Sequence, residues 1–223
     1  GVYKNALKLD MLIHKVLNFK QIEHDNEDTL IRSNIELHSF LERVLKNYSA
    51  IFEEKKIQPN LTTDEKQIWM NLDMIKMESV FTNLLTNAIK FIPATGGKID
   101  IHLTQKAQNV IIHISDNGSG IKQEDLPYIF IRYFQSKNNG KRKNGSGIGL
   151  YIVRKFVELH NGHVEINSAG ENQGTSATIT LPYSAENRVP SLQSIEKTDK
   201  ETAKLTSACG GDQADYRSKL DRP

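Results

Sequence analysis

The sequence predicts an α+β fold, a two-layer α/β sandwich in which helices cover a mixed, mostly antiparallel sheet. Two observations support this prediction. Amphipathic helical patterns and short strand patterns alternate between about residues 31 and 182, and the strand patterns stand next to each other in pairs. Helices and adjacent strands in this order are typical of one helical layer packed on one largely antiparallel sheet.

Residues 1–28 precede this domain and carry a helical pattern of their own. From Val2 to about Glu23, apolar residues recur three and four positions apart with no Gly or Pro between them. The stripe is wider than a lone surface helix needs, which favours one long helix in a bundle or against a second copy of the chain. A core helix of the same domain is the alternative. The stripe consists of Leu7, Leu9, Leu12, Ile13, Val16, Leu17, Phe19 and Ile22.

Three helices and four strands are expected in the main domain, which we place at residues 29–182. Apolar residues at Phe40–Phe52 predict one amphipathic helix, and Asp73, a favourable N-cap, opens a second that extends to about Lys90. A third helix, Gly149–His160, stops at Asn161-Gly162. The expected strands are Lys98–Leu103, Val110–Ser115, His163–Asn167 and Thr175–Leu181. The second helix is expected to bury Met77, Val80, Phe81, Leu84, Leu85 and Ala88.

Composition excludes several classes of protein. The net charge of +2 argues against a dedicated nucleic-acid surface, and the single Cys209 excludes an intrachain disulfide and a Cys-rich zinc site. No apolar run approaches the ~18 residues of a membrane span, and no signal-peptide pattern opens the chain. The chain begins with Gly1, so we expect a fragment of a longer protein, and residues 183–223 have the polar texture of a linker or tail.

The second helix carries a polar face that could bind a metal ion with phosphates. Asn83, Asn87 and Lys90 are four and three residues apart, so they share one side of the helix. Amide oxygens beside an ammonium group suit Mg²⁺ with attached phosphates, because Mg²⁺ prefers oxygen ligands and keeps several waters. A solvated helix face is the alternative.

A carboxylate followed by glycines stands at the end of the second strand, in Asp116-Asn117-Gly118-Ser119-Gly120-Ile121. The glycines allow a ligand to approach the backbone closely, while the carboxylate accepts a hydrogen bond from a donor such as an adenine amino group. An ordinary turn is the alternative.

A third glycine-rich segment, Gly145-Ser146-Gly147-Ile148-Gly149-Leu150, opens the last helix. Backbone N–H groups at a helix start bind phosphate oxygens, and the helix dipole favours the negative charge. The segment is neither a Walker loop nor a Rossmann turn, because no Lys-Ser/Thr follows the glycines and no strand precedes them. A flexible hinge is the alternative.

The loop between the two glycine segments is basic. Residues 122–144 contain six basic and two acidic side chains, which indicates a flap that closes over phosphates. A solvated loop or a nucleic-acid patch is the alternative.

These segments, together with Ile129–Phe134 and Gly174-Thr175, resemble in their order the catalytic ATP-binding domain of bacterial sensor histidine kinases. That domain belongs to the superfamily of ATPases with the Bergerat-type fold, which includes gyrase, the heat-shock chaperone ATPases and MutL. The similarity covers about residues 31–182, and residues 1–28 resemble the second helix of the family's dimerisation and phosphotransfer bundle.

The resemblance implies a role for each matching residue. Asn83, Asn87 and Lys90 would form the catalytic group, with Asn87 as the Mg²⁺ ligand and Lys90 near the phosphates of ATP. Asp116 would accept a hydrogen bond from adenine N6, and Thr175 would support it through water. The remaining nucleotide contacts would come from Phe91, Gly118, Gly120, Ile121, the lid residues Arg132 and Lys137, and the phosphate-side turn Gly145, Ser146, Gly147, Gly149 and Leu150.

The hydrolytic relatives carry a Glu four residues before the magnesium Asn, where this sequence has Asn83. An amide cannot act as a general base, which favours a kinase over an ATPase. A related ATPase, a protein-serine kinase or a nucleotide-binding regulatory module are the alternatives.

The resemblance also implies partners outside this fragment. None of the seven histidines has the context of the family's phosphoacceptor, and His160 is expected to be a charge at a helix C-terminus. The acceptor helix is therefore expected to be missing. The expected partners are that helix, a response regulator receiver domain and a second subunit that forms a homodimer through the N-terminal helix. We expect a bacterial cytoplasmic domain whose parent protein is anchored in the inner membrane.

Overall fold

The computed structural model describes residues 29–93, 96–138, 141–142 and 146–183. All of them fall within one compact unit, Gly1–Asn187. The helix predicted over Val2–Glu23 and the tail predicted beyond Tyr183 lie outside the described residues. Among the described helices, none combines the length and the hydropathy that a membrane-spanning helix needs.

A five-stranded sheet forms one layer of the domain, as predicted. The strand order is β2-β4-β5-β9-β8, in which β2 and β4 are parallel and the other neighbouring pairs are antiparallel. Alternate residues of β4 and β5 are buried against the helices, and the opposite face of these strands is polar. The strands are β2 (Gln58–Thr63), β4 (Lys98–Lys106), β5 (Asn109–Asp116), β8 (His163–Asn167) and β9 (Thr175–Pro182).

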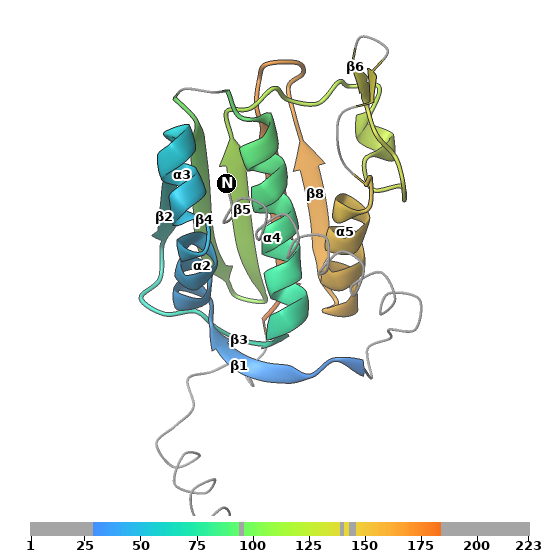
Figure 1. Ribbon diagram of the computed structural model, residues 1–223. Coiled ribbons are helices and arrows are strands. Elements are labelled where there is room, and N and C mark those ends of the chain that lie inside the picture. Colours follow the sequence, from blue (N-terminus) through green and yellow to red (C-terminus); the bar gives the residue numbers. More distant parts are fainter. Residues whose placement is uncertain (1–28, 94–95, 139–140, 143–145, 184–223) are drawn as a thin grey trace, which may run out of the picture. The chain divides into compact units, whose positions relative to one another are not determined.

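The helices form the second layer and lie on one face of the sheet (Figure 1). The long helix α4 (Met74–Phe91) begins where predicted, because the Asp73 carboxylate caps it by accepting the N–H of Lys76. Its predicted apolar face is buried in full. Beside it lies α5 (Gly149–Leu159), which ends before Asn161 in the left-handed conformation.

Four differences from the predicted elements were found. The predicted single helix at residues 40–52 is two helices, α2 (Leu37–Lys46) and α3 (Ser49–Lys55), because the poor helix formers Asn47 and Tyr48 interrupt it. The strands β1 (Arg32–Glu36) and β3 (Trp69–Asp73) form a separate antiparallel pair. The edge strand β2 was not predicted, since its sequence QPNLTT has one aliphatic residue. The basic loop contains a 3₁₀ turn, η2 (Leu126–Tyr128), and two short strands, β6 (Lys137–Asn138) and β7 (Lys141–Arg142).

His160 is not the exposed charge that the sequence suggested. It is buried, its Nδ1 lies 2.7 Å from the carbonyl oxygen of Phe156, and its Nε2 accepts the N–H of Asp73 at 3.0 Å. Burial lowers the pKa of His160 below its ordinary value, so the ring is neutral. The physical reason is that α5 ends against the start of α4, where the ring joins the two helices.

The segments singled out in the sequence meet at one end of this sandwich. The end of α4, the end of β5 and the start of β9 lie together at the top of Figure 1, α5 begins below them on the right, and β1 and β3 lie at the bottom.

Candidate nucleotide-binding site

The loop that follows β5 is held by backbone hydrogen bonds to two other segments. The N–H of Ser119 donates to the carbonyl of Phe91 at the end of α4, at 2.9 Å. The N–H of Gly174 donates to the carbonyl of Gly118 at 3.0 Å, and the N–H of Asn172 to that of Ser119 at 2.8 Å. The end of α4, the loop and the turn before β9 are therefore one connected framework.

Two glycines allow this close approach. Gly120 and Gly174 have φ values of +65° and +72°, in the left-handed region. A Cβ at Gly120 would lie 2.0 Å from the carbonyl oxygen of Gly170, and one at Gly174 would lie 2.1 Å from that of Asp116. Any side chain at either position would force the two loops apart.

The Asp116 carboxylate lies at the centre of the framework. Its Oδ1 accepts the N–H of Gly118 at 2.8 Å, and the backbone of Thr175, its cross-strand neighbour, also donates to the carboxylate. Burial raises the pKa of Asp116, and the two backbone donors oppose this shift. A carboxylate has more acceptor positions than these two donors occupy, so Asp116 can still read a ligand donor.

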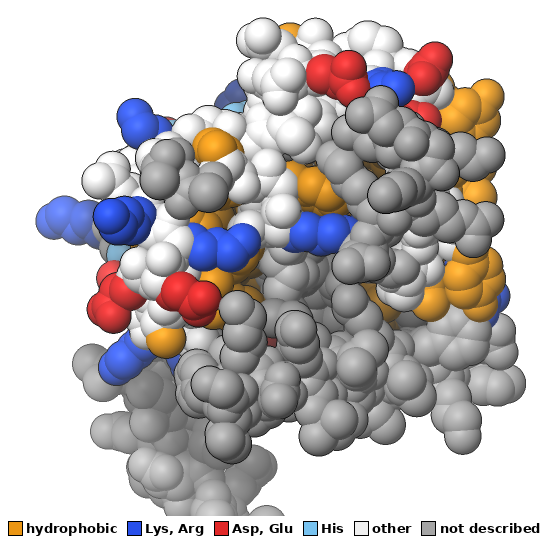
Figure 2. All heavy atoms as spheres, turned by 45° about the horizontal axis from the view of Figure 1, so that its top comes forward, with side chains coloured by type: hydrophobic (Ala, Val, Ile, Leu, Met, Phe, Trp, Pro, Cys, Tyr) orange, Lys and Arg blue, Asp and Glu red, His pale blue; other side chains and the backbone are white. Residues whose placement is uncertain are grey.

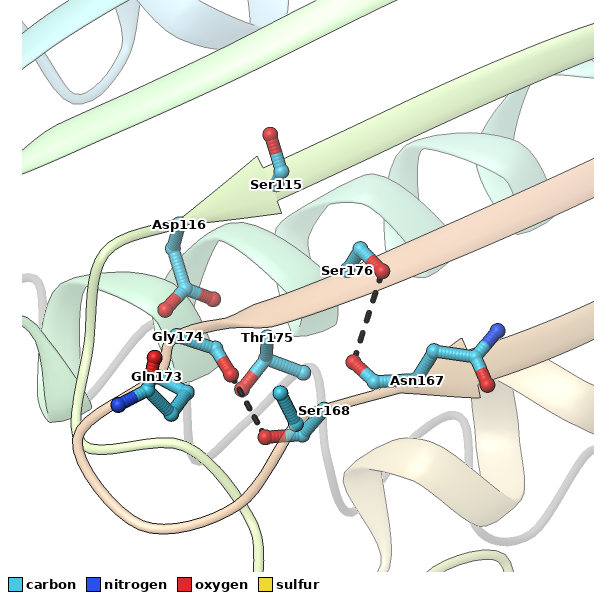
Figure 3. A pocket seen from close by; sticks show the side chains of 9 residues that line it. Ser115, Asp116, Asn167, Ser168, Gln173, Gly174, Thr175 and Ser176 are labelled. Carbon is cyan, nitrogen blue, oxygen red and sulfur yellow. Dashed lines mark hydrogen bonds between the residues drawn. The ribbon is translucent and has the colours of Figure 1, made fainter.

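A pocket of about 370 Å³ opens beside this carboxylate (Figure 3). It is formed by the ends of β5 and β8 and by the start of β9. Its walls are Ser115, Asp116, Asn167, Ser168, Ala169, Gln173, Gly174, Thr175 and Ser176.

The polar residues of α4 divide between two environments. Asn83 is buried, and its Nδ2 donates to the carbonyl of Ser79 at 2.8 Å, so its amide is directed back along its own helix. Asn87 is half-buried. Lys90 is exposed at the helix end, with its Nζ 4.7 Å from the centre of the Phe91 ring. Asn87 and Lys90 are therefore the residues of this face that a ligand could reach.

The start of α5 lies directly against this part of α4. A Cβ at Gly149 would lie 2.8 Å from the Asn83 Oδ1, so a side chain at this position would require the Asn83 amide to shift. No side chain caps the first turn of α5, which leaves its backbone N–H groups to an anion. Of the other predicted residues here, Ser146 is exposed, Leu150 is half-buried and Gly145 lies outside the described residues.

The lid begins at the same place. Gly147, at φ +67°, accepts the N–H of Tyr133 at 2.8 Å, and a Cβ on it would lie 2.6 Å from the Tyr133 carbonyl carbon. Arg132 stacks on the Tyr133 ring, with 5.1 Å between Cζ and the ring centre. Lys137 falls in β6, and its side chain is outside the described part of the structure. Lys and Arg side chains gather on this end of the molecule (Figure 2).

Sequence reasoning missed Ser168, which lines the pocket beside Asp116 and Thr175. A serine directly after a predicted strand, six residues before Gly174, was the available signal. Its hydrogen bond with the N–H of Ile121 could not be predicted, because the two residues are 47 positions apart in the sequence.

This arrangement agrees with the family that the sequence matches. Residues 72–185 match the model of the histidine kinase-, DNA gyrase B-, and HSP90-like ATPases. The chain belongs to this ATPase family. Within it, the chain is similar to sensor kinases: it is 30% identical over 184 residues to the heme sensor protein HssS of Staphylococcus saprophyticus, covering 81% of the chain and 37% of that protein.

Solved structures of the family share the fold described above. The Mycobacterial sensor histidine kinase MprB superposes with a TM-score of 0.59 at 26% identity, over 68% of this chain and 97% of that one. The catalytic domain of the histidine kinase ThkA superposes with a TM-score of 0.61 at 23% identity, over 69% of this chain and 98% of that one. The chain spans about a third of the length of the curated relatives that it matches first.

Proposed function

We propose that this chain carries the catalytic domain of a two-component sensor histidine kinase, which transfers the γ-phosphoryl group of ATP to a histidine. The observation that carries the proposal is the Asp116 carboxylate, held by two backbone donors in the pocket at the end of β5. Such a carboxylate accepts a hydrogen bond from the N6 amine of adenine and repels the O6 carbonyl oxygen of guanine.

The triphosphate extends from this base site toward the start of α5. In this proposal Gly120, Ile121 and Phe91 contact the base from beside the pocket. The N–H groups of the first turn of α5, which the N-cap residue Ile148 does not cap, receive phosphate oxygens. Lys90 supplies positive charge beside the phosphates, and Arg132 and Lys137 do so from the lid.

A magnesium ion fits the donor set beside this path. Asn87 offers one neutral amide oxygen, and Mg²⁺ is commonly held by one or two protein oxygens together with substrate phosphates and waters. When bound there, the ion neutralises charge on the phosphates.

Asn83 favours transfer over hydrolysis. It occupies the position of the hydrolytic general base, and its amide is buried and hydrogen-bonded to Ser79. No proton can be taken from water there. An imidazole needs no such base: its ring nitrogen attacks the γ-phosphorus, the bond to the bridging oxygen breaks, and ADP leaves.

The partners follow from the same proposal. The acceptor histidine belongs to a dimerisation helix outside this fragment, residues 1–28 continue that bundle in a homodimer, and a response regulator receives the phosphoryl group. ThkA, a kinase of this fold, has been solved in complex with the response regulator protein TrrA. The parent protein is membrane-anchored, with this domain in the bacterial cytoplasm.

Transfer to a separate acceptor tests the proposal. The chain is incubated with Mg²⁺ and γ-labelled ATP together with a separately produced dimerisation segment that bears an acceptor histidine. We expect acid-labile phosphate on that segment, and we expect Asn87→Ala to abolish it through loss of the metal. Asn60→Ala, an exposed change on the edge strand β2, is the matched control.

Three results would contradict the proposal. Steady release of phosphate into water would indicate an ATPase, and nucleotide binding without transfer or hydrolysis would indicate a regulatory module. Unchanged transfer in Asn87→Ala would remove the metal assignment.

A further inference from the structure

Ser168 connects three segments of the pocket through one hydroxyl group. It follows β8 directly, is half-buried, and lies with Asp116 and Thr175 in the pocket wall (Figure 3). Its Oγ accepts the N–H of Ile121 at 3.0 Å and that of Gly170 at 3.3 Å.

The same hydroxyl donates to the turn before β9. The carbonyl oxygens of Gly174 and Gly170 lie 2.7 Å and 3.2 Å from Oγ. A serine has one proton to donate, so the shorter contact, to Gly174, is the hydrogen bond. Ser168 thus fixes the distance between the Ile121 nitrogen, in the loop after β5, and the Gly174 carbonyl oxygen, in the turn before β9.

The surrounding backbone allows little movement of the two segments that Ser168 joins. The carbonyl oxygen of Gly170 lies 2.0 Å from the position that a Cβ on Gly120 would take. The carbonyl oxygen of Asp116 lies 2.1 Å from the position that a Cβ on Gly174 would take. A small change at Ser168 therefore shifts Ile121 relative to Asp116 and Thr175.

We propose that Ser168 is a positioning residue for adenine: its hydroxyl holds the Ile121 backbone and the Gly174-Thr175 turn at the separation that a flat purine needs between its wall and the Asp116 carboxylate. This inference rests on the proposed function, since it assigns the residue that shapes the base half of the nucleotide site.

Calorimetric titration with ADP and Mg²⁺ tests the inference on four forms of the whole chain. We expect Ser168→Ala to weaken ADP binding about tenfold, because two N–H groups and one carbonyl lose their partner. Ser168→Thr keeps the hydroxyl and is expected to stay within about threefold of the parent. The control is Ser33→Ala, the same change at an exposed position on β1, at the opposite end of the domain (Figure 1).

Amide hydrogen exchange gives a second readout that does not depend on nucleotide. The N–H of Ile121 should exchange faster in Ser168→Ala than in the parent, and no faster in Ser33→Ala. If Ser168→Ala does not fold, Ser168→Cys replaces it, since a thiol is a weak hydrogen-bonding group.

The outcomes separate the two proposals. If the parent binds no ADP, the proposed function fails, and unchanged exchange at Ile121 would then also overturn the role of Ser168. If the parent binds ADP but Ser168→Ala binds equally well, or Ser168→Thr and Ser33→Ala lose as much as Ser168→Ala, the positioning role alone is wrong.

Discussion

At the scale of single residues, the site depends on the half-buried carboxylate of Asp116. Asp116 is held by the backbone N–H groups of Gly118 and Thr175, yet burial still raises its pKa. The folded chain therefore retains its proton to a higher pH than the unfolded chain. Between the pKa of Asp116 in the unfolded chain and its higher pKa in the folded chain, the folded state binds more protons than the unfolded state. The free energy of unfolding therefore falls as the pH rises through this interval.

Asp116→Asn separates binding from stability. We expect ADP affinity to fall by about 10- to 100-fold, because an amide presents an N–H donor as well as an oxygen to the adenine amine. Since the buried charge is removed, the variant should not be less stable than the parent at pH 7, and its stability should lack the parent's decline above the ordinary aspartate range. Urea unfolding at several pH values, with ADP calorimetry, measures both. A variant that binds ADP as tightly as the parent would refute the adenine assignment.

At the scale of elements, α4 and α5 are joined by polar contacts at both ends of α5. At the start of α5, Gly149 lies against Asn83 in the middle of α4. At the other end, neutral His160 accepts the N–H of Asp73, with Lys76 and Arg32 as the nearby positive charges that further lower its pKa. A neutral ring is needed there, because a protonated Nε2 could not accept that hydrogen bond.

This junction predicts a dependence of stability on pH. Because the pKa of His160 is lowered on folding, its contribution is fully present above the ordinary histidine pKa of about 6.5 and is lost as the pH falls through the lowered value. We expect His160→Gln to be about 1–2 kcal/mol less stable than the parent at pH 7.5 and to lose less stability on acidification to pH 5. His163→Gln, an exposed change on β8, is the control and should follow the parent. If the stability of all three proteins, measured by urea unfolding, changed with pH in parallel, His160 would be excluded as the titrating group.

At the scale of the whole molecule, one end of the sandwich carries the proposed nucleotide site, while the other holds the single tryptophan. Trp69 lies on β3, at the end opposite the site in Figure 1. Its fluorescence therefore reports global unfolding and not direct contact with a ligand.

Nucleotide should stabilise the fold by mass action. At an ADP concentration 100 times its dissociation constant, the native state gains about 2.7 kcal/mol. For a domain of this size, this corresponds to a rise of about 5–10 °C in the unfolding midpoint followed through Trp69. GDP at the same concentration should give a smaller rise, because guanine presents a carbonyl oxygen to Asp116. Equal shifts with the two nucleotides would argue against recognition of the base.

Much of the fold could be predicted from the sequence because its long elements carry strong periodic signals. The apolar face of α4 and its Asp73 cap were confirmed, as were β8 and the stop of α5 at Asn161. The edge strand β2 could not be predicted, since half-exposed strands have little apolar alternation.

The site was less predictable than the fold. Glycines and Asp116 have a recognisable order, and the structure brings Asp116, Phe91 and Thr175 into one framework; their contacts with nucleotide remain predictions. Ser168 and the buried state of His160 depend on partners that lie far away in the sequence, 87 residues in the case of Asp73 and His160. Local patterns contain no information on such pairs.

The hydrogen bond between Tyr133 and Gly147 has a consequence for how this domain could diversify. Because 2.8 Å separates the Tyr133 nitrogen from the Gly147 oxygen, the two ends of the thirteen-residue segment between them, residues 134–146, are already held together. Lengthening such a loop has a small entropic cost, about 0.6 kcal/mol of free energy for each doubling of its length. Insertions or exchanges within this segment can thus alter which protein surface the domain meets, while the base pocket and the start of α5 keep their shape.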